Sequence, residues 1–143
     1  MLIKQLSVFV ENTSGRLADI TAALALAGID IRALSIADTT NFGILRLIVN
    51  RPDAAEKALK EAGFTVSLTD VIAIGMADEP GAFAKAMQAL ADACISIEYM
   101  YAFNSRDQGR ACVILRVKEE KAAVEALKAR NIEILEEAKV YTM

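Results

Sequence analysis

The hydrophobic positions near the start of the chain change from a strand spacing to a helical spacing. Leu6, Val8 and Val10 occupy alternate positions, which predicts a half-buried strand. From about Gly15 to Ala27, apolar residues recur at i, i+3, i+4 and i+7, and this spacing predicts an amphipathic helix. Gly28 follows, at a place where a left-handed residue ends many helices. The chain therefore begins with a strand and a helix joined by a short turn.

The next segments continue with two strands, a helix and a further strand. The sequence "IDIRALSIA" predicts a second strand, "DTTNFG" a hairpin turn, and "ILRLIV" the returning strand. Pro52 is placed to open a second helix in its first turn, and Gly63 to close it. The segment "FTVSL" predicts a short last strand. The predicted order is thus strand, helix, strand, strand, helix, strand.

The second half of the chain repeats this pattern. Gly81 lies 66 residues after Gly15, and the same offset relates "GIDI" to "CISI". The apolar positions of the first helices agree in register: Leu17 with Phe83, Ile20 with Ala86, Thr21 with Met87, and Leu24 with Leu90. Further along, "AAEKALKEAGF" corresponds to "AAVEALKARNI" at an offset of 68 residues, which indicates a two-residue insertion in the second copy. We therefore expect two homologous repeats, residues 1–70 and 71–143.

The second copy departs from the first in two places. Cys94 stands where the first copy has Gly28, so its helix is expected to end without glycine. The tail "AKVYTM" has no counterpart, and its apolar residues predict an additional strand.

A βαββαβ unit places two helices on one face of a four-stranded antiparallel sheet. The predicted fold class is α+β, with two ferredoxin-like repeats whose antiparallel sheets lie side by side and carry their helices on one face. A single unit of roughly 70 residues buries too little surface to be comfortably stable, so the repeats are expected to share their cores. Apolar residues on both faces of some strands favour a homodimer.

The short apolar runs and the net charge of the chain argue against a membrane-spanning protein and a nucleic-acid-binding protein. Hydrophobic residues make up 55% of the chain, yet no apolar run is long enough to span a membrane. The start lacks the small-residue cleavage site of a signal peptide, and we expect a soluble, cytoplasmic protein. The net charge of −3 argues against a nucleic-acid partner.

The chain has no histidine, so catalysis by Ser-His-Asp or Cys-His groups is excluded. Cys94 and Cys112 are too few for a disulfide framework or a zinc site, and both are expected to be buried. Arg106, Asp107 and Arg110 are interpreted as turn residues. The sequence predicts no cofactor, no metal and no catalytic residue, and hence a protein that is not an enzyme.

The two strand-helix turns carry the candidate chemistry. "NTSGRL" and "DEPGAF" place a glycine at each helix start, where unpaired N–H groups attract a carboxylate and glycine leaves the backbone open. Asp78 and Glu79 could hold an ammonium group, so the turn suits a zwitterionic amino acid. The alternative is that Ser14 or Asp78 only caps its helix and that Pro80 only begins one.

The order of elements, the "DEPGAF" turn and "GIDI" after the first helix resemble the ACT domain, in both copies and over nearly the whole chain. The resemblance implies a regulatory module of amino-acid metabolism that binds a small ligand where two units meet. The first copy departs from the family's pattern, with Thr13-Ser14 where the second has Glu79-Pro80. The residues implicated as ligand-binding are Asn12, Thr13, Ser14, Gly15, Arg16, Leu17, Ile29, Asp30, Ile31, Asp78, Glu79, Pro80, Gly81, Ala82, Phe83 and Ser96.

Two function classes follow. The first is an amino-acid sensor whose ligand bridges two repeats and is signalled to a partner, such as an enzyme of amino-acid metabolism. The second is an interaction or regulatory subunit whose turns bind no ligand. RNA binding is a weaker alternative that uses the alternating Tyr99, Tyr101 and Phe103; packing of these rings in a core or interface is the simpler interpretation.

Overall fold

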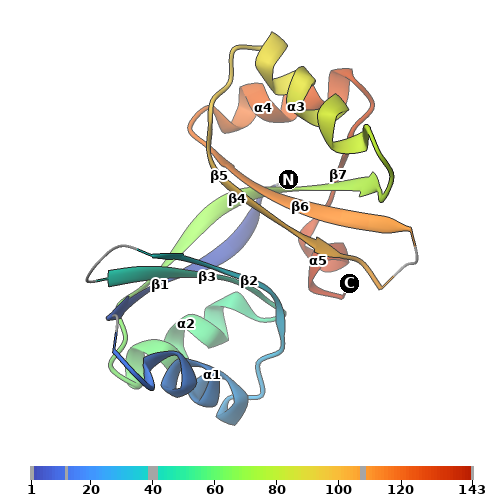
Figure 1. Ribbon diagram of the computed structural model, residues 1–143. Helices are drawn as coiled ribbons and strands as arrows, with labels where there is room; N and C mark the ends of the chain where they lie inside the picture. Colours follow the sequence, from blue (N-terminus) through green and yellow to red (C-terminus); the bar gives the residue numbers. More distant parts are fainter. Residues whose placement is uncertain (1, 12, 39–41, 107–108, 143) are drawn as a thin grey trace. The chain divides into compact units, whose positions relative to one another are not determined.

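The computed structural model describes residues 2–11, 13–38, 42–106, 109–142, which form two compact units (Figure 1). We call them the N-terminal unit, Lys4–Thr69, and the C-terminal unit, Asp70–Met143 together with Met1–Ile3. Strand β4 (Val66–Ala77) contributes its first residues to the N-terminal unit and the rest to the C-terminal unit. Residues 39–41 and 107–108 lie outside the described residues, and with them parts of the two predicted turns.

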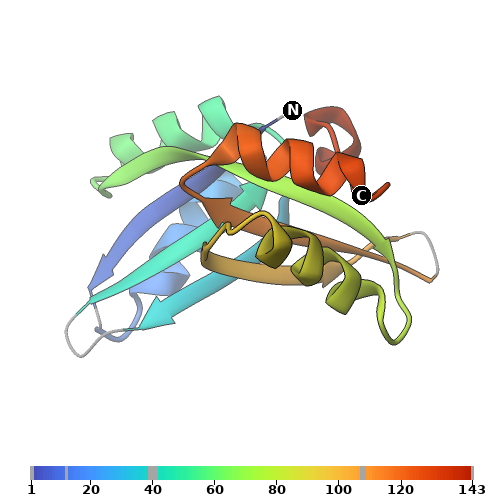
Figure 2. The ribbon, with the colours of Figure 1, turned by 90° about the horizontal axis from the view of Figure 1, so that it is seen from above.

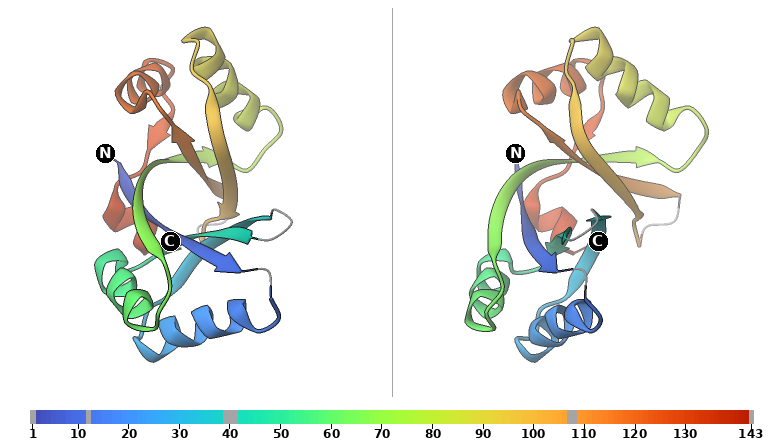
Figure 3. Two further views of the ribbon diagram at one scale, coloured as in Figure 1. Left: turned by 90° about the vertical axis from the view of Figure 1, so that its left-hand side faces the viewer. Right: turned by 60° about the vertical axis from the view of Figure 1, so that its left-hand side comes forward.

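The N-terminal unit is a sheet with two helices on one face (Figure 3). Its elements are β1 (Ile3–Glu11), α1 (Arg16–Leu26), β2 (Ile31–Asp38), β3 (Phe42–Val49), α2 (Pro52–Glu61) and the start of β4. The strand order is β2-β3-β1. The chain that leads into β4 lies beside β1, where the Phe9 N–H donates a hydrogen bond of 3.0 Å to the Thr65 carbonyl. Both β1 and β2 pair antiparallel with β3.

The C-terminal unit repeats this arrangement and adds one element. Its elements are the rest of β4, α3 (Ala82–Asp92), β5 (Ile97–Asn104), β6 (Arg110–Val117), α4 (Glu120–Ala129), β7 (Glu133–Ile134) and α5 (Glu137–Tyr141). The strand order is β5-β6-β4, and β7 pairs with β4. Helices α3 and α4 contact each other, and Figure 2 shows both of them. The predicted fold class of two βαββαβ repeats is confirmed.

Each unit has its own hydrophobic core between sheet and helices. In the N-terminal unit, Ile20 and Leu24 of α1 pack against a cluster that includes Leu45 and Leu47 of β3. In the C-terminal unit, Ala86 and Leu90 of α3 pack against Ile72, Ile74, Val113 and Leu115. The helical stripe predicted from the sequence is therefore buried at these positions. Its first members, Leu17 and Phe83, are instead exposed.

Two predicted elements are wrong. The tail forms the short helix α5, not a strand, and Val140 anchors it by complete burial. The last three residues of "FTVSL" and the whole of "VIAIGM" lie in the single strand β4, because no glycine or proline interrupts the chain between them. Of the cysteines, Cys112 is buried as expected, and burial raises the pKa of its thiol to about 12. Cys94 is exposed, contrary to the prediction.

The ends of α1 and α3 use the same backbone turn with different residues. Gly28 has φ 69° and Cys94 has φ 57°. In both turns the next N–H reaches back over the helix end, from Ile29 to the Leu24 carbonyl and from Ile95 to the Leu90 carbonyl, each at 3.0 Å. These are the bonds of a glycine-type helix terminator. The second copy thus keeps the turn although it has lost the glycine.

This substitution leads to a paired prediction. Gly28→Cys is expected to lower the free energy of unfolding by about 1–2 kcal/mol, the cost of a left-handed L-residue, and its Cβ would lie 3.3 Å from Nη2 of Arg51. Cys94→Gly is expected to raise it, but by less, because glycine also gains entropy in the unfolded chain. Urea unfolding of both variants and the wild type measures the two effects. Equal stability of all three proteins would contradict the prediction.

Candidate functional site

The turns that precede α1 and α3 have the same geometry. Gly15 and Gly81 are the residues before the helices, with φ 87° and 92°, a left-handed conformation that favours glycine. Neither helix has a side-chain cap, so the prediction that Ser14 or Asp78 caps its helix is wrong. A Cβ at either glycine would meet nothing within 4 Å. Both helix starts therefore present backbone N–H groups from an open turn.

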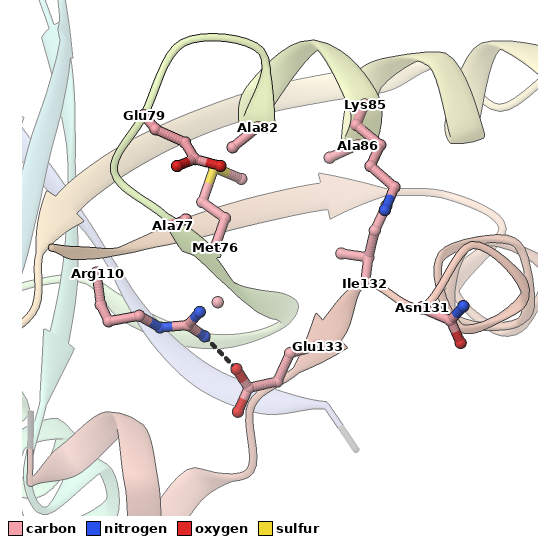
Figure 4. A pocket seen from close by; sticks show the side chains of 11 residues that line it. Met76, Ala77, Glu79, Ala82, Lys85, Ala86, Arg110, Asn131, Ile132 and Glu133 are labelled. Carbon is pink, nitrogen blue, oxygen red and sulfur yellow. Dashed lines mark hydrogen bonds and ion pairs between the residues drawn. The ribbon is translucent and has the colours of Figure 1, made fainter.

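A crevice of about 260 Å³ lies beside the α3 turn, within the C-terminal unit (Figure 4). It is bordered by the end of β4, the start of α3, the start of β6 and the connection between α4 and β7. The lining residues are Gly75, Met76, Ala77, Glu79, Ala82, Lys85, Ala86, Arg110, Asn131, Ile132 and Glu133. Pockets for drug-sized ligands run from about 300 to 1,000 Å³, so this space suits a smaller metabolite. We call it the C-terminal crevice.

One side of the C-terminal crevice is held by a chain of ion pairs. Arg110 of β6 forms an ion pair with Oε2 of Glu133, and Lys139 Nζ lies 2.7 Å from Oε1 of the same carboxylate. The hydrogen bond from Lys139 is the main cause that lowers the pKa of Glu133 from its ordinary value of 4.5. A Cβ on Gly75 would lie 3.0 Å from Glu133 Oε2 and 3.1 Å from Arg110 Nη2. Glycine at this position therefore lets the pair lie against β4.

Two further charges border the same crevice and are not engaged. Glu79, in the turn, and Lys85, one turn into α3, are both exposed, and neither has an ion-pair partner among the residues described. Figure 4 shows their side chains on different sides of the space, apart from the Arg110–Glu133 pair. Glu79 can accept hydrogen bonds from an ammonium group, and Lys85 can bind a carboxylate. This is the charge pattern that a free amino acid requires.

The N-terminal unit has a crevice at the equivalent place, with a volume of about 380 Å³. Its lining residues are Phe9, Glu11, Arg16, Phe42, Gly63, Phe64 and Thr65. The repeat offsets of 66 and 68 residues relate Phe9, Glu11 and Arg16 to Gly75, Ala77 and Ala82, and Gly63–Thr65 to Asn131–Glu133. The two repeats thus form the same crevice from the same elements with different side chains. We call this second space the N-terminal crevice.

The structure brings some of the predicted residues to the crevices and not others. Arg16 lines the N-terminal crevice, and Glu79 and Ala82 line the C-terminal one. The other described turn residues are exposed without lining either space: Thr13, Ser14, Gly15, Leu17, Asp78, Pro80, Gly81 and Phe83. Asn12 lies outside the described residues.

The predicted residues at the start of the second strand lie elsewhere in each unit. They follow the C-terminus of α1 or α3, and an 11-residue helix separates its two ends by about 16 Å. Ile29 is buried in the core and Ile31 packs against it, while Asp30 forms an ion pair of 3.2 Å with Arg32. Ser96 is exposed near Cys94. Within one unit these residues do not join the turn residues at a common site.

Several crevice residues were not predicted from the sequence. Arg110 was interpreted as part of a turn, but it begins β6 and pairs with Glu133. The sequence pattern places Lys85 in a predicted helix and Ile132 at a predicted strand, but it indicates no ligand-binding role for either. The one available signal was the repeat itself, since Asn131–Glu133 align with Gly63–Thr65. That alignment shows that the two segments occupy equivalent places in the repeats, but it does not show that either lies near the strand-helix turn.

The ion pairs of Glu133 predict a pH dependence of stability. A carboxyl group whose pKa is lowered in the folded state stabilises that state above its ordinary pKa and loses the contribution as the pH falls. For Glu133 the loss is expected below about pH 4.5. Glu133→Gln should therefore be less stable than the wild type at neutral pH, and the difference should shrink toward pH 3. Thermal unfolding between pH 7 and 3 measures this, with Glu125→Gln, an exposed position on α4, as the control. A constant difference at all pH values would contradict the prediction.

The described residues offer neither a cluster of metal-binding side chains nor a membrane-spanning helix. No group of three or more histidine, cysteine, aspartate or glutamate side chains there could hold a metal ion. None of the helices described is long and apolar enough to cross a lipid bilayer.

Comparison with known proteins identifies related chains. A family model described as an ACT domain pair matches residues 1–143. The crystal structure of protein BT0572 from Bacteroides thetaiotaomicron is similar over 100% of this chain and 98% of its own, with 42% identity and a TM-score of 0.94. The ligand-free regulatory subunit of aspartate kinase from Thermus thermophilus is similar over 91% of this chain and 95% of its own, with 20% identity and a TM-score of 0.65. The regulatory subunit of aspartate kinase from Thermus flavus is similar over 92% of this chain and 95% of its own, with 20% identity and a TM-score of 0.61. No curated protein matches the sequence.

Proposed function

This chain belongs to the ACT domain pair family, and from that premise we propose that it is a regulatory protein that senses a free amino acid. The observation that carries the proposal is the C-terminal crevice. There Glu79 and Lys85 have opposite charges without an ion-pair partner among the described residues, and they lie beside a helix start without a side-chain cap. The ammonium group of the ligand pairs with Glu79. Its carboxylate pairs with Lys85, assisted by the N–H groups of α3.

Signalling follows from the place of the crevice in the fold. The crevice is bordered by Glu79 of the turn before α3, by α3 itself and by the α4–β7 connection. A ligand that contacts all three favours the conformations in which they are held together. If a partner protein binds those conformations better, the ligand raises the partner's affinity by the same factor by which the partner raises the ligand's affinity. Regulation of an enzyme of amino-acid metabolism is consistent with the likeness to regulatory subunits of aspartate kinase.

A second candidate function is that of an interaction subunit without a ligand. Strand β2 is an edge strand of its sheet, and Leu34 and Ile36 on it are large, exposed hydrophobic residues. Such an edge can pair with another chain, which supports homodimer formation or docking to an enzyme. This candidate predicts that partner binding does not depend on small molecules. A cytoplasmic location belongs to both proposals.

Thermal unfolding in the presence of each of the twenty amino acids tests the sensor. A ligand present at 100 times its Kd stabilises the folded state by about 2.7 kcal/mol, which raises the Tm by several degrees. Glu79→Gln should remove the shift that the C-terminal crevice produces, while Glu125→Gln on α4 should retain it. If no amino acid shifts the Tm, amino-acid sensing is excluded. A pull-down that recovers the same partner with and without amino acids would then favour the interaction subunit.

A further inference from the structure

The N-terminal crevice has an aromatic wall that its counterpart lacks. Phe9 of β1 and Phe42 of β3 are 55% and 51% exposed. Their ring centroids are 6.5 Å apart, with an interplanar angle of 71°. Because both rings are about half exposed, a further aromatic group can pack against them in the offset-stacked or edge-to-face arrangement that aromatic pairs prefer. Phe64 provides a third ring at the start of β4.

Arg16 is held in position but not fully satisfied in the same crevice. Its guanidinium lies over the Phe64 ring, 4.7 Å from the centroid, where the ring attracts the cation. Its Nε is buried and has no hydrogen-bond partner among the described residues. The nearest carboxylate that pairs with it, Asp19, is 3.8 Å from Nη1, too far for a good hydrogen bond. Because Nε itself is buried, a ligand reaches the guanidinium through its terminal nitrogens, and the Arg16 side chain is 36% exposed. A planar carboxylate is the acceptor that arginine binds best.

The opposite charge is also present. Glu11, the last residue of β1, lines the crevice and is exposed. Its carboxylate can accept hydrogen bonds from an ammonium group. The N-terminal crevice thus combines one cation, one anion and three aromatic rings.

The equivalent positions of the C-terminal crevice have a different chemistry. Gly75 replaces Phe9, Ala82 replaces Arg16, and Glu133 replaces Thr65. There the cation comes from Lys85 on α3, and none of the described residues that line the space is aromatic. The two crevices therefore share a position in the fold but not a set of contacts for the ligand's side chain.

We propose that the N-terminal crevice binds a free amino acid with an aromatic side chain, so that the two repeats recognise different ligands. Arg16 binds the carboxylate, Glu11 binds the ammonium group, and the ligand's ring packs against Phe9 and Phe42. This inference rests on the proposed sensing function and assigns a ligand class to one of its two crevices.

The composition of the chain offers a direct assay. The protein contains no tryptophan, so the change in fluorescence of added L-tryptophan reports binding without indole emission from the protein. Titrations with L-tryptophan, and calorimetric titrations with L-phenylalanine and L-alanine, compare the wild type with three variants. Arg16→Gln removes the carboxylate contact, and Phe9→Ser removes an exposed ring outside the core. Lys57→Gln, at an exposed position on α2 outside both crevices, is the matched control.

We expect both aromatic amino acids to bind the wild type more tightly than L-alanine. Arg16→Gln should weaken their binding by at least about tenfold, as expected for a charged hydrogen bond, and Phe9→Ser should weaken it also. Lys57→Gln should leave it unchanged. Aromatic amino acids that bind Arg16→Gln and Phe9→Ser as tightly as the wild type would overturn the proposal. If only non-aromatic amino acids bind, this inference fails while amino-acid sensing stands; if none binds, both fail.

Discussion

Truncation of Leu90 to alanine is expected to lower the free energy of unfolding by about 2–5 kcal/mol. Leu90 is 1% exposed and packs between α3 and the sheet of the C-terminal unit, so its removal leaves a cavity in that core. Leu24→Ala, at the equivalent position of the N-terminal unit, should have an effect in the same range, since Leu24 is also buried. The loss is a large share of the roughly 5–15 kcal/mol that stabilises a typical domain.

Urea unfolding measures both variants. Leu26→Ala is the matched control, because Leu26 is 90% exposed on α1 and its truncation should change stability by less than about 0.5 kcal/mol. If Leu90→Ala behaves like Leu26→Ala, the two-core description of the fold is wrong.

Charge reversal at Lys85 is expected to have the largest effect on ligand binding. In Lys85→Glu, the cation that pairs with the ligand's carboxylate becomes an anion beside it. The amino acid that stabilises the wild type through the C-terminal crevice should lose at least about 100-fold in affinity, or roughly 2.7 kcal/mol. Lys85 is exposed, so the variant should fold normally, which circular dichroism verifies.

Calorimetric titration with that amino acid gives the affinity. Lys57→Glu, at another exposed lysine, on α2 and outside both crevices, is the control for the change in net charge. Equal losses in the two variants would mean that long-range charge, and not a contact in the crevice, determines binding. Unchanged affinity in Lys85→Glu would remove Lys85 from the site.

Much of the fold was readable because its signals are local. The helix that begins at Pro52 and the turn at Gly63 were predicted from single residues with restricted or permissive backbones. The 66-residue offset made the repeat visible and placed Gly15 and Gly81 at equivalent helix starts. The family followed from the same turns. The tail failed because a short apolar segment does not distinguish a strand from a helix by pattern alone.

The sequence by itself determined two βαββαβ repeats, the glycine turns before α1 and α3, and the family, because each depends on periodicity or on the backbone preferences of nearby residues. Only the tertiary structure decided which side chains share a crevice. Arg110 and Glu133 are 23 positions apart, and they meet because β6 and β7 both pair with β4. Ile29 is buried and Phe9 exposed for a comparable reason, since the packing of helices on one face of the sheet determines which apolar residues lose contact with water.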